Sequence, residues 1–469
     1  MRKKVILQRF ARREDGALTA YGLFLVIAMI CVGGLAIDVA NAVMVRTHLQ
    51  VAADSAAHAA IVAREHRTEA QAKAIAISVA QASLPAAKFG ATIQAQDIQF
   101  GTWDRTTRQF TAQAGSNAAV QVQTQRLASR GNAMATYFLK FVGLWTMDVV
   151  SDSVLETYYP TCFREGFVAE NRVDVQSNNR YRAGFCIHSN SHVEVNNNNV
   201  FENGVIVSMP DKTNIVTPSS NGGWGNNTGL QQAMRSGSYQ IRILQRVQDI
   251  VAGFNNSASQ HFRNDYMNLP VQTNAFSPST RLDNAVWRPG EVHSFTCASN
   301  GGGGGGGNGG GGNGNGNGGG GGGGGGGNNT VTIPSNTTLI NGVIRTNCTL
   351  RLGSGVTLEN VLIISESTDP RAIDGASGVT LGRNDGCTPG GGTQIVTMGG
   401  VNFPANLSIF GSQIIAMGDI DFEANANGVE GVSMVAGGQI DSTSNMDMGF
   451  CNGSGLENRF EAEYFRVVR

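Results

Sequence analysis

Residues 17–60 read ALTAYGLFLVIAMICVGGLAIDVANAVMVRTHLQVAADSAAHAA, and this stretch decides the topology of the whole chain. From position 16 to position 37 there is no charged side chain, and Asp15 and Asp38 bound the run. A helix of this length extends roughly 33 Å at about 1.5 Å per residue, which is enough to cross the apolar core of a bilayer. We therefore expect a transmembrane helix over 16–37 that continues without a break into the alanine-rich segment behind it.

The residues in front of this run predict its orientation. Residues 1–15 form a basic tail with six cations and two acidic groups, Glu14 and Asp15. By the positive-inside rule such a tail stays in the cytoplasm. The sequence thus predicts a single-pass protein of the bacterial inner membrane whose bulk lies in the periplasm or outside the cell.

The sequence allows more than one interpretation of how the N-terminus is processed. Ala40, Asn41 and Ala42 form an A-x-A string that a signal peptidase accepts, although the apolar run is long for a signal peptide and Asp38 lies just before the string. Prepilin processing after Gly16 is disfavoured, because Tyr21 stands where a Glu is expected. A retained anchor is the favoured interpretation.

Composition points to an exported, β-rich protein. The 469 residues include 63 Gly but only 15% charged side chains, and the net charge of −1 gives no indication of nucleic-acid binding. Six of the seven cysteines follow the apolar run, and an oxidising compartment favours their pairing. We expect two or three disulfides, with Cys162–Cys186 the first candidate by proximity; buried free thiols are the alternative.

The alanine-rich segment after Asp38 has small residues at helical spacing, up to about Leu84. Such a stripe lets another backbone approach closely, as small-residue faces do between membrane helices. Asp38, Gln50 and Asp54 are the polar groups at which a partner helix would meet it. The alternative is an ordinary alanine-rich helix that packs on its own downstream domain, and the two interpretations are compatible.

A family resemblance follows from these residues. The string Gly16-Ala17, the apolar run, the exit Ala36-Ile37-Asp38-Val39 and the segment LQVAADSAA over 49–57 resemble the N-terminal region of TadG-like proteins of Flp (tight-adherence) pilus assembly. The resemblance covers residues 10–62 and continues more loosely to about 157; His58 stands in place of a usual Leu. It implies a membrane-anchored assembly component whose partners are other pilus-assembly or pilin-like membrane proteins. It carries no catalytic motif.

Residues 97–155 change to a period of two, which predicts strands near 98–103, 109–112, 119–124 and 147–150. Residues 132–143 predict a helix with Met134, Tyr137, Phe138 and Phe141 on one face. A long N-terminal helix with a small antiparallel sheet is a pilin-like plan.

Further along, short β-rich pieces alternate with Asn and Gly. Strings such as GVNF at 400, GDIDF at 418 and GQIDS at 438 repeat about every 18–20 residues. This period predicts a right-handed parallel β-solenoid, in which each coil buries its side chains only by stacking on the next. The overall class is α+β with an all-β C-terminal part.

The expected organisation has seven parts. They are a cytoplasmic tail (1–15), the transmembrane helix (16–37), a TadG-like helix with a small α/β module (38–157), a first solenoid part (158–210), an insertion with an amphipathic helix near 238–254 (211–297), a Gly/Asn-rich flexible linker (298–329) and a second solenoid part (330–469). A neutrally expanded loop is the favoured interpretation of the linker.

The sequence holds no G-x-S-x-G, H-E-x-x-H or P-loop string, and we assign no cofactor, metal site or catalytic residue. β-Solenoids do host glycan-cleaving enzymes, and Asp419, Asp421 and Asp441 recur at equivalent positions of the repeat. Equivalent Asp residues more often serve corners. The predicted role is structural, in pilus assembly; the alternative is an exported adhesin that binds surface glycans, or a carbohydrate-active enzyme.

Overall fold

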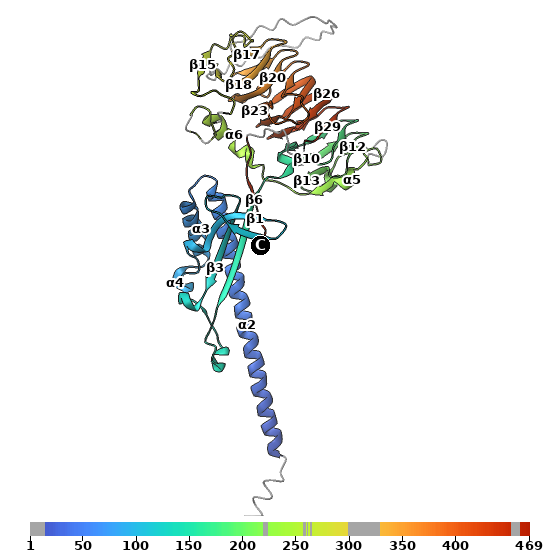
Figure 1. Ribbon diagram of the computed structural model, residues 1–469. Helices are drawn as coiled ribbons and strands as arrows, with labels where there is room; N and C mark the ends of the chain where they lie inside the picture. The colour runs from blue at the N-terminus through green and yellow to red at the C-terminus, as the bar shows by residue number, and fades with distance from the viewer. Residues whose placement is uncertain are drawn as a thin grey trace, which may run out of the picture. The chain divides into compact units, whose positions relative to one another are not determined.

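The computed structural model describes residues 15–218, 224–256, 259, 261–262, 265–298, 329–451 and 460–469. The chain divides into two compact units (Figure 1). Unit 1 takes the chain up to Tyr158 together with Glu463–Arg469, and unit 2 is Tyr159–Ala462. Each unit is described separately.

Unit 1 is built on one long helix, α2 (Asp15–Arg64), which confirms the continuous helix expected from the sequence. Among the described residues it is the helix long and apolar enough to cross a membrane. Its side chains up to Met44 are almost all exposed, whereas Leu49, Ala53 and Ala57 are fully buried. The N-terminal half thus leaves its apolar side chains exposed, and the C-terminal half is a core element of unit 1.

The partner of the C-terminal half is a five-stranded antiparallel sheet with strand order β2-β1-β3-β6-β30. The strands are β1 (Ile98–Asp104), β2 (Gln109–Ala112), β3 (Ala119–Arg126), β6 (Val149–Tyr158) and β30 (Tyr464–Val467). Side chains of β3 and β6 bond to the helix backbone: the Thr124 hydroxyl donates to the Leu49 carbonyl at 2.8 Å. The alanine stripe permits this close approach, because a larger side chain would hold helix and sheet apart.

Two further helices follow α2 in unit 1. Helix α3 (Glu69–Ser83) begins with a capping box, in which the Thr68 hydroxyl and the Gln71 side chain each accept from the other's backbone N–H. It packs against α2 through Ala72, Ala76 and Ala80, and a short α4 (Ala86–Phe89) follows. Single turns of 3-10 helix lie at η1 (Ala95–Asp97) and η2 (Ala128–Arg130).

The helix predicted over 132–143 is wrong. The segment forms a hairpin, with β4 (Met134–Ala135) paired to β5 (Thr146–Met147) and one 3-10 turn, η3 (Leu139–Val142), at its tip. Gly143 ends the turn in the left-handed conformation, and the Thr136 hydroxyl donates to the Leu144 carbonyl. Tertiary contacts override the helical spacing of the aromatic residues.

Unit 2 is dominated by one large sheet of parallel strands, which supports the all-β prediction. The strands of its first stretch are β7 (Gly166–Ala169), β8 (Val173–Val175), β9 (Arg180–Tyr181), β10 (Cys186–Ser189), β11 (Val193–Val195), β12 (Val200–Phe201) and β13 (Ile206–Met209), followed by a single 3-10 turn η5 (Lys212–Asn214). A 3-10 turn, η4 (Thr161–Phe163), precedes them. Cys186 pairs with both Gly166 and Ile206, so neighbouring strands repeat every 20 residues.

The predicted insertion also contributes to this sheet. It holds α5 (Leu230–Ala233), β14 (Met234–Ser236), α6 (Arg242–Gly253), β15 (Thr273–Phe276) and β16 (Val292–Phe295). Helix α6 confirms the amphipathic helix expected near 238–254. Its buried face, with Leu244, Val247 and Val251, covers the outer side of strands β23 and β25.

The last stretch of unit 2 carries the remaining strands. They are β17 (Thr330–Ile333), β18 (Thr338–Thr346), β19 (Thr349–Leu352), β20 (Thr357–Ser365), β21 (Ile373–Gly375), β22 (Thr380–Leu381), β23 (Gln394–Thr397), β24 (Val401–Phe410), β25 (Gln413–Ala416), β26 (Ile420–Glu430), β27 (Ser433–Ala436), β28 (Ile440–Asp441) and β29 (Asp447–Gly449). Long strands pair with two successive strands on one of their sides: β20 lies between β18 and the two strands β22 and β23, and β24 lies between the two strands β21 and β22 and the strand β26.

Strand order in the sheet differs from order in the chain. One row of parallel neighbours runs β15, β16, β18, β20, β23, β25, β27, β7, β10, β13, β14. The late strand β27 therefore lies directly beside the early strand β7, with Ser433 opposite Gly166. The first and second β stretches predicted from the sequence are parts of one continuous sheet, joined in the reverse of their chain order.

The C-terminus corrects one predicted boundary. Residues 463–469, which the sequence assigns to the second β stretch, belong to unit 1, where β30 pairs with β6 and Tyr464 lies opposite Tyr158. Unit 2 is accordingly an insertion between two neighbouring strands of unit 1. Its own ends lie together, since Arg164 forms an ion pair with Glu461 at 3.6 Å.

Candidate functional site

Asp38 connects α2 to the tip of the β4–β5 hairpin through hydrogen bonds. Its side chain is fully buried. The carboxylate accepts three backbone N–H bonds, from Tyr137 at 2.6 Å, Phe138 at 2.8 Å and Leu139 at 2.6 Å. These donors are the unpaired N–H groups at the start of the η3 turn, and a carboxylate is a strong acceptor for such groups. Asp38 thus fixes the tip against the helix.

Gln50 and Asp54, the other predicted contact residues, also bond within unit 1. The Gln50 amide donates to Asp54 Oδ1 at 2.9 Å and to the Asp152 carbonyl at 3.1 Å. The alanine stripe beside them is buried by α3 and the sheet. The structure therefore realises the alternative in which the helix packs on its own domain. Contact of Asp38, Gln50 and Asp54 with a partner helix stays a prediction.

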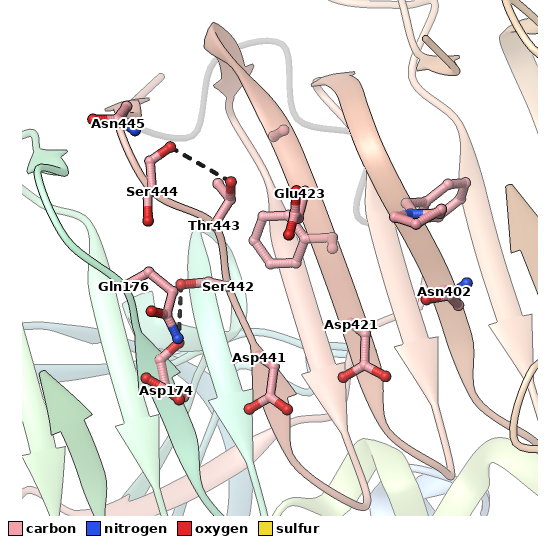
Figure 2. Close-up of a pocket in the computed structure, with 14 residues that line it drawn as sticks. Asp174, Gln176, Asn402, Asp421, Glu423, Asp441, Ser442, Thr443, Ser444 and Asn445 are labelled. Carbon is pink, nitrogen blue, oxygen red and sulfur yellow. Dashed lines mark hydrogen bonds between the residues drawn. The ribbon is translucent and has the colours of Figure 1, made fainter. Parts of the chain in front are cut away.

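Unit 2 carries a polar groove across several parallel strands (Figure 2). Asn402, Asp421, Asp441 and Asp174 occupy successive in-register positions on β24, β26, β28 and β8. Neighbouring strands lie about 4.8 Å apart, so the row places polar groups at a regular short spacing. Ser442, Thr443 and Asn445 line the adjoining wall.

The charges in this row are partly balanced. Arg172 donates to Asp441 Oδ1 at 2.6 Å and to Glu194 Oε2 at 3.3 Å. Burial raises the pKa of Asp174, and the neighbouring carboxylates Glu194 and Asp441 add to this, against the opposing effect of Arg172. Burial and then the carboxylates of Asp441 and Asp419 raise the pKa of Asp421.

Asp419 has a different position from the other two recurring aspartates. Its carboxylate accepts the Gln439 backbone N–H at 2.9 Å, which is a corner role. Asp421 and Asp441 face the groove side by side (Figure 2). The structure thus brings together two of the three carboxylates that the sequence singled out. It adds Asp174, which sequence reasoning missed because its strand is remote in the chain.

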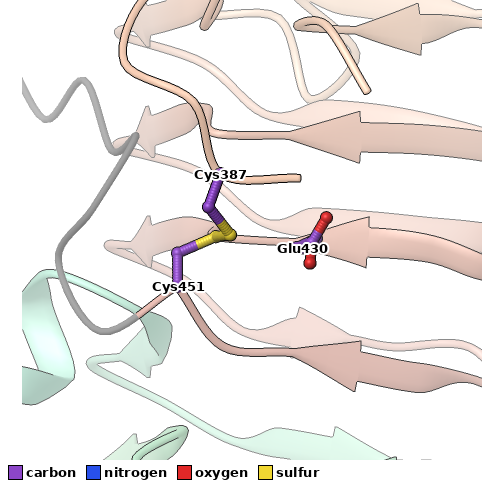
Figure 3. A group of neighbouring side chains, drawn as sticks. All are labelled: Cys387, Glu430 and Cys451. Carbon is purple, nitrogen blue, oxygen red and sulfur yellow. A yellow bond between two sulfur atoms is a disulfide. The ribbon is translucent and has the colours of Figure 1, made fainter. Parts of the chain in front are cut away.

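All six cysteines after α2 are paired, in agreement with the sequence prediction: Cys162–Cys186, Cys297–Cys348 and Cys387–Cys451. The Glu430 carboxylate lies beside the last pair (Figure 3). Metal-binding cysteines act as thiolates, and two sulfurs joined to each other supply none. We assign no metal to this group.

Family models match both units. A model described as "Domain of unknown function (DUF7867)" matches residues 166–302 and 324–452, more than half of the chain. The chain belongs to the DUF7867 family. The DUF7867 match falls within unit 2 and contains the parallel sheet and the groove. No curated protein matches the chain.

Unit 1 of this DUF7867 protein matches two further models. Residues 16–74 match "Putative Flp pilus-assembly TadE/G-like" and residues 55–154 match "Putative Tad-like Flp pilus-assembly". The TadG-like resemblance of the N-terminal region is thereby confirmed. A single apolar N-terminal helix in such a region fits a single-pass membrane protein related to Flp pilus assembly.

Proposed function

We propose that this protein is a structural component of a Flp (tight-adherence) pilus-assembly system. α2 would hold it in the bacterial inner membrane, with the basic tail in the cytoplasm and both units exported. The observation that carries the proposal is the division of α2: its first half exposes apolar side chains, and its second half is the core of a Tad-matched unit. A rigid helix shared by membrane and domain suits an anchor. Its partners would be other pilus-assembly or pilin-like membrane proteins.

In this proposal unit 2 is a right-handed parallel β-solenoid presented outside the membrane. Three rows of parallel pairing support it: β7, β8 and β9 each pair with the strand that follows 20 residues later, β10, β11 and β12. A chain that visits three rows in turn completes one coil per repeat. Three disulfides suit an oxidising, exported compartment. The role is scaffolding, not catalysis.

A deletion strain tests the proposal. Loss of surface pili, restored by the full-length gene, is the expected result. A gene with residues 16–37 replaced by a cleavable signal peptide should export the protein without restoring pili. Normal pili in the deletion strain would refute the assembly role, and protein recovered from the medium with its N-terminus near Val43 and its remainder intact would refute the anchor.

A second candidate function rests on the groove. Its row of carboxylates and amides, open along several strands, suits hydrogen bonding to sugar hydroxyls, which would make unit 2 a glycan-binding adhesin or a carbohydrate-active enzyme. Binding of the exported protein to a panel of surface polysaccharides tests adhesion, with Asp441→Ala as the groove variant and Asp249→Ala, at an exposed position of α6, as the control. Cleavage that Asp421→Ala abolishes would favour the enzyme. Absence of both binding and cleavage removes this candidate.

A further inference from the structure

The tip of the unit 1 hairpin, residues 137–145, is apolar and exposed. Phe141 is 79% exposed, Val142 73% and Trp145 69%, and Tyr137 and Leu144 are also exposed. Monomeric soluble domains rarely leave such a cluster uncovered. The tip therefore has a partner that unit 1 itself does not supply.

The place of the tip along α2 identifies that partner. Phe138 lies against Gly34, where a Cβ would be only 2.6 Å from the ring. Gly34 is inside the uncharged run, one helical turn before Asp38. The hairpin thus extends along α2 to the end of the uncharged run (Figure 1).

The apolar surface of α2 does not end at Asp38. The Asp38 carboxylate is buried under the tip, and its charge is met by three N–H donors. On the exposed side of α2 the apolar surface continues through Val39 and Val43 to Met44, and Arg46 is the first cation after the uncharged run. The helix and the tip together form one apolar band at this level.

We propose that the tip inserts into the outer interface of the bilayer in which α2 is anchored. Tyr137 and Trp145 are residue types that favour this interface. Lys140, whose ammonium lies 5.7 Å from the Phe141 ring centre, can extend its charge to the headgroups. Backbone groups of the tip are paired internally, with Leu144 N–H donating to the Leu139 carbonyl at 3.1 Å, so insertion leaves few backbone polar groups exposed to lipid. The protein then has two attachments to one membrane surface, which fixes the rotation of α2 and of unit 1.

The inference rests on α2 spanning a membrane, and the experiment separates the two. Full-length protein is reconstituted into phosphatidylethanolamine–phosphatidylglycerol vesicles with nitroxide labels near the headgroup or near the chain end of the lipid. The labels quench tryptophan fluorescence, which is measured for each protein. The contribution of Trp145 is the difference in quenching between wild type and Trp145→Phe. Trp103→Phe gives the same difference for a tryptophan in the sheet. Leu25→Trp in the Trp145→Phe background reports the middle of the membrane-spanning part of α2.

We expect headgroup-proximal labels to quench Trp145 about two- to threefold more strongly than chain-end labels, with little lipid quenching of Trp103. The indole introduced by Leu25→Trp should show the opposite depth preference. If Trp145 is quenched by aqueous acrylamide and not by lipid, the tip faces water and the inference is wrong. If neither acrylamide nor the lipid labels quench Trp145, a protein surface covers the tip, and the inference is equally wrong. In both cases lipid quenching of the probe at position 25 shows that the anchor stands.

Discussion

The Cys297–Cys348 disulfide closes the part of the chain that contains the Gly/Asn tract, and this makes a quantitative prediction. The two cysteines are separated by 51 residues. Asn347 reinforces the closure, because its side chain accepts from the Cys297 N–H at 2.7 Å and donates to the Cys297 carbonyl at 3.0 Å. In the chain-entropy model a cross-link over a loop of this length stabilises the folded state by about 4 kcal/mol.

The Cys297→Ala/Cys348→Ala variant should therefore lose about 4 kcal/mol of unfolding free energy in unit 2. Deleting residues 301–315 roughly halves the linker expected over 298–329, and each halving of a loop changes its closure entropy by only about 0.6 kcal/mol. With the disulfide present the deletion also shortens the closed loop of the unfolded state, so the two effects largely cancel and stability should change by less than about 0.5 kcal/mol. Without the disulfide the same deletion should stabilise by about 0.6 kcal/mol.

Denaturant unfolding of the four proteins, followed by tryptophan fluorescence, measures this cycle. Trp287 reports on the relevant end of the sheet, because it is buried and its indole N–H donates to the Ile340 carbonyl at 2.9 Å. The Cys162→Ala/Cys186→Ala variant is the matched control: its 24-residue separation excludes the tract, so the deletion should again have little effect in that background. A deletion that shifts wild-type stability by more than about 1 kcal/mol would mean that the tract makes folded-state contacts, and the entropy reasoning would be refuted.

Three further outcomes follow from the contacts described. Asp38→Ala should speed amide exchange at residues 137–139, because it removes the acceptor of all three N–H groups, while Asp54→Ala leaves those amides unchanged; equal rates in wild type and Asp38→Ala would contradict the proposed fixing of the tip. Asp174→Asn should stabilise unit 2 at neutral pH by roughly 0.5 kcal/mol after allowance for solvent screening. Burial raises the pKa of Asp174, so protonation of its carboxyl group favours the folded state at low pH, and this stabilisation is lost as pH rises through the folded-state pKa. The extra stability of Asp174→Asn should therefore vanish near pH 4. If thermal unfolding shows the same extra stability at that pH, titration of Asp174 is not its origin. Replacing residues 159–463 by Asn-Gly should leave unit 1 folded as judged by circular dichroism and protease resistance, because the turn joins strands already paired at Tyr158 and Tyr464; an unfolded product would show that unit 1 depends on unit 2.

Local sequence patterns were sufficient to predict several features of the molecule. The uncharged run and the alanine spacing predicted α2, and the spacing of α6 apolar residues predicted its buried face. Cys162–Cys186 was predictable because the two residues are close in sequence. These features depend on neighbours within a few turns or one repeat, and sequence patterns record such neighbours directly.

Long-range pairings were not predictable in this way. Nothing in the short string Tyr464–Val467 specifies β6 as its partner, and nothing in Ser433–Ala436 specifies β7. The same limit explains the groove, where Asp174 and Asp441 meet from distant parts of the chain. The wrong prediction of a helix over 132–143 has a related reason. The aromatic residues there have helical spacing, but the Asp38 carboxylate and the β4–β5 pairing hold the backbone in another conformation.

The pairing of β27 with β7, and of β30 with β6, has a consequence for the order of events during the proposed export. In the proposed orientation the N-terminal part of the chain would cross first, so the edges of β6 and β7 would remain without these partners until the last few dozen residues had crossed the membrane. Exposed strand edges of this kind invite pairing with other chains. A truncated polypeptide can complete neither unit, so only full-length molecules should escape quality control, and a holding chaperone at the exit of the translocation channel should be needed for as long as synthesis lasts.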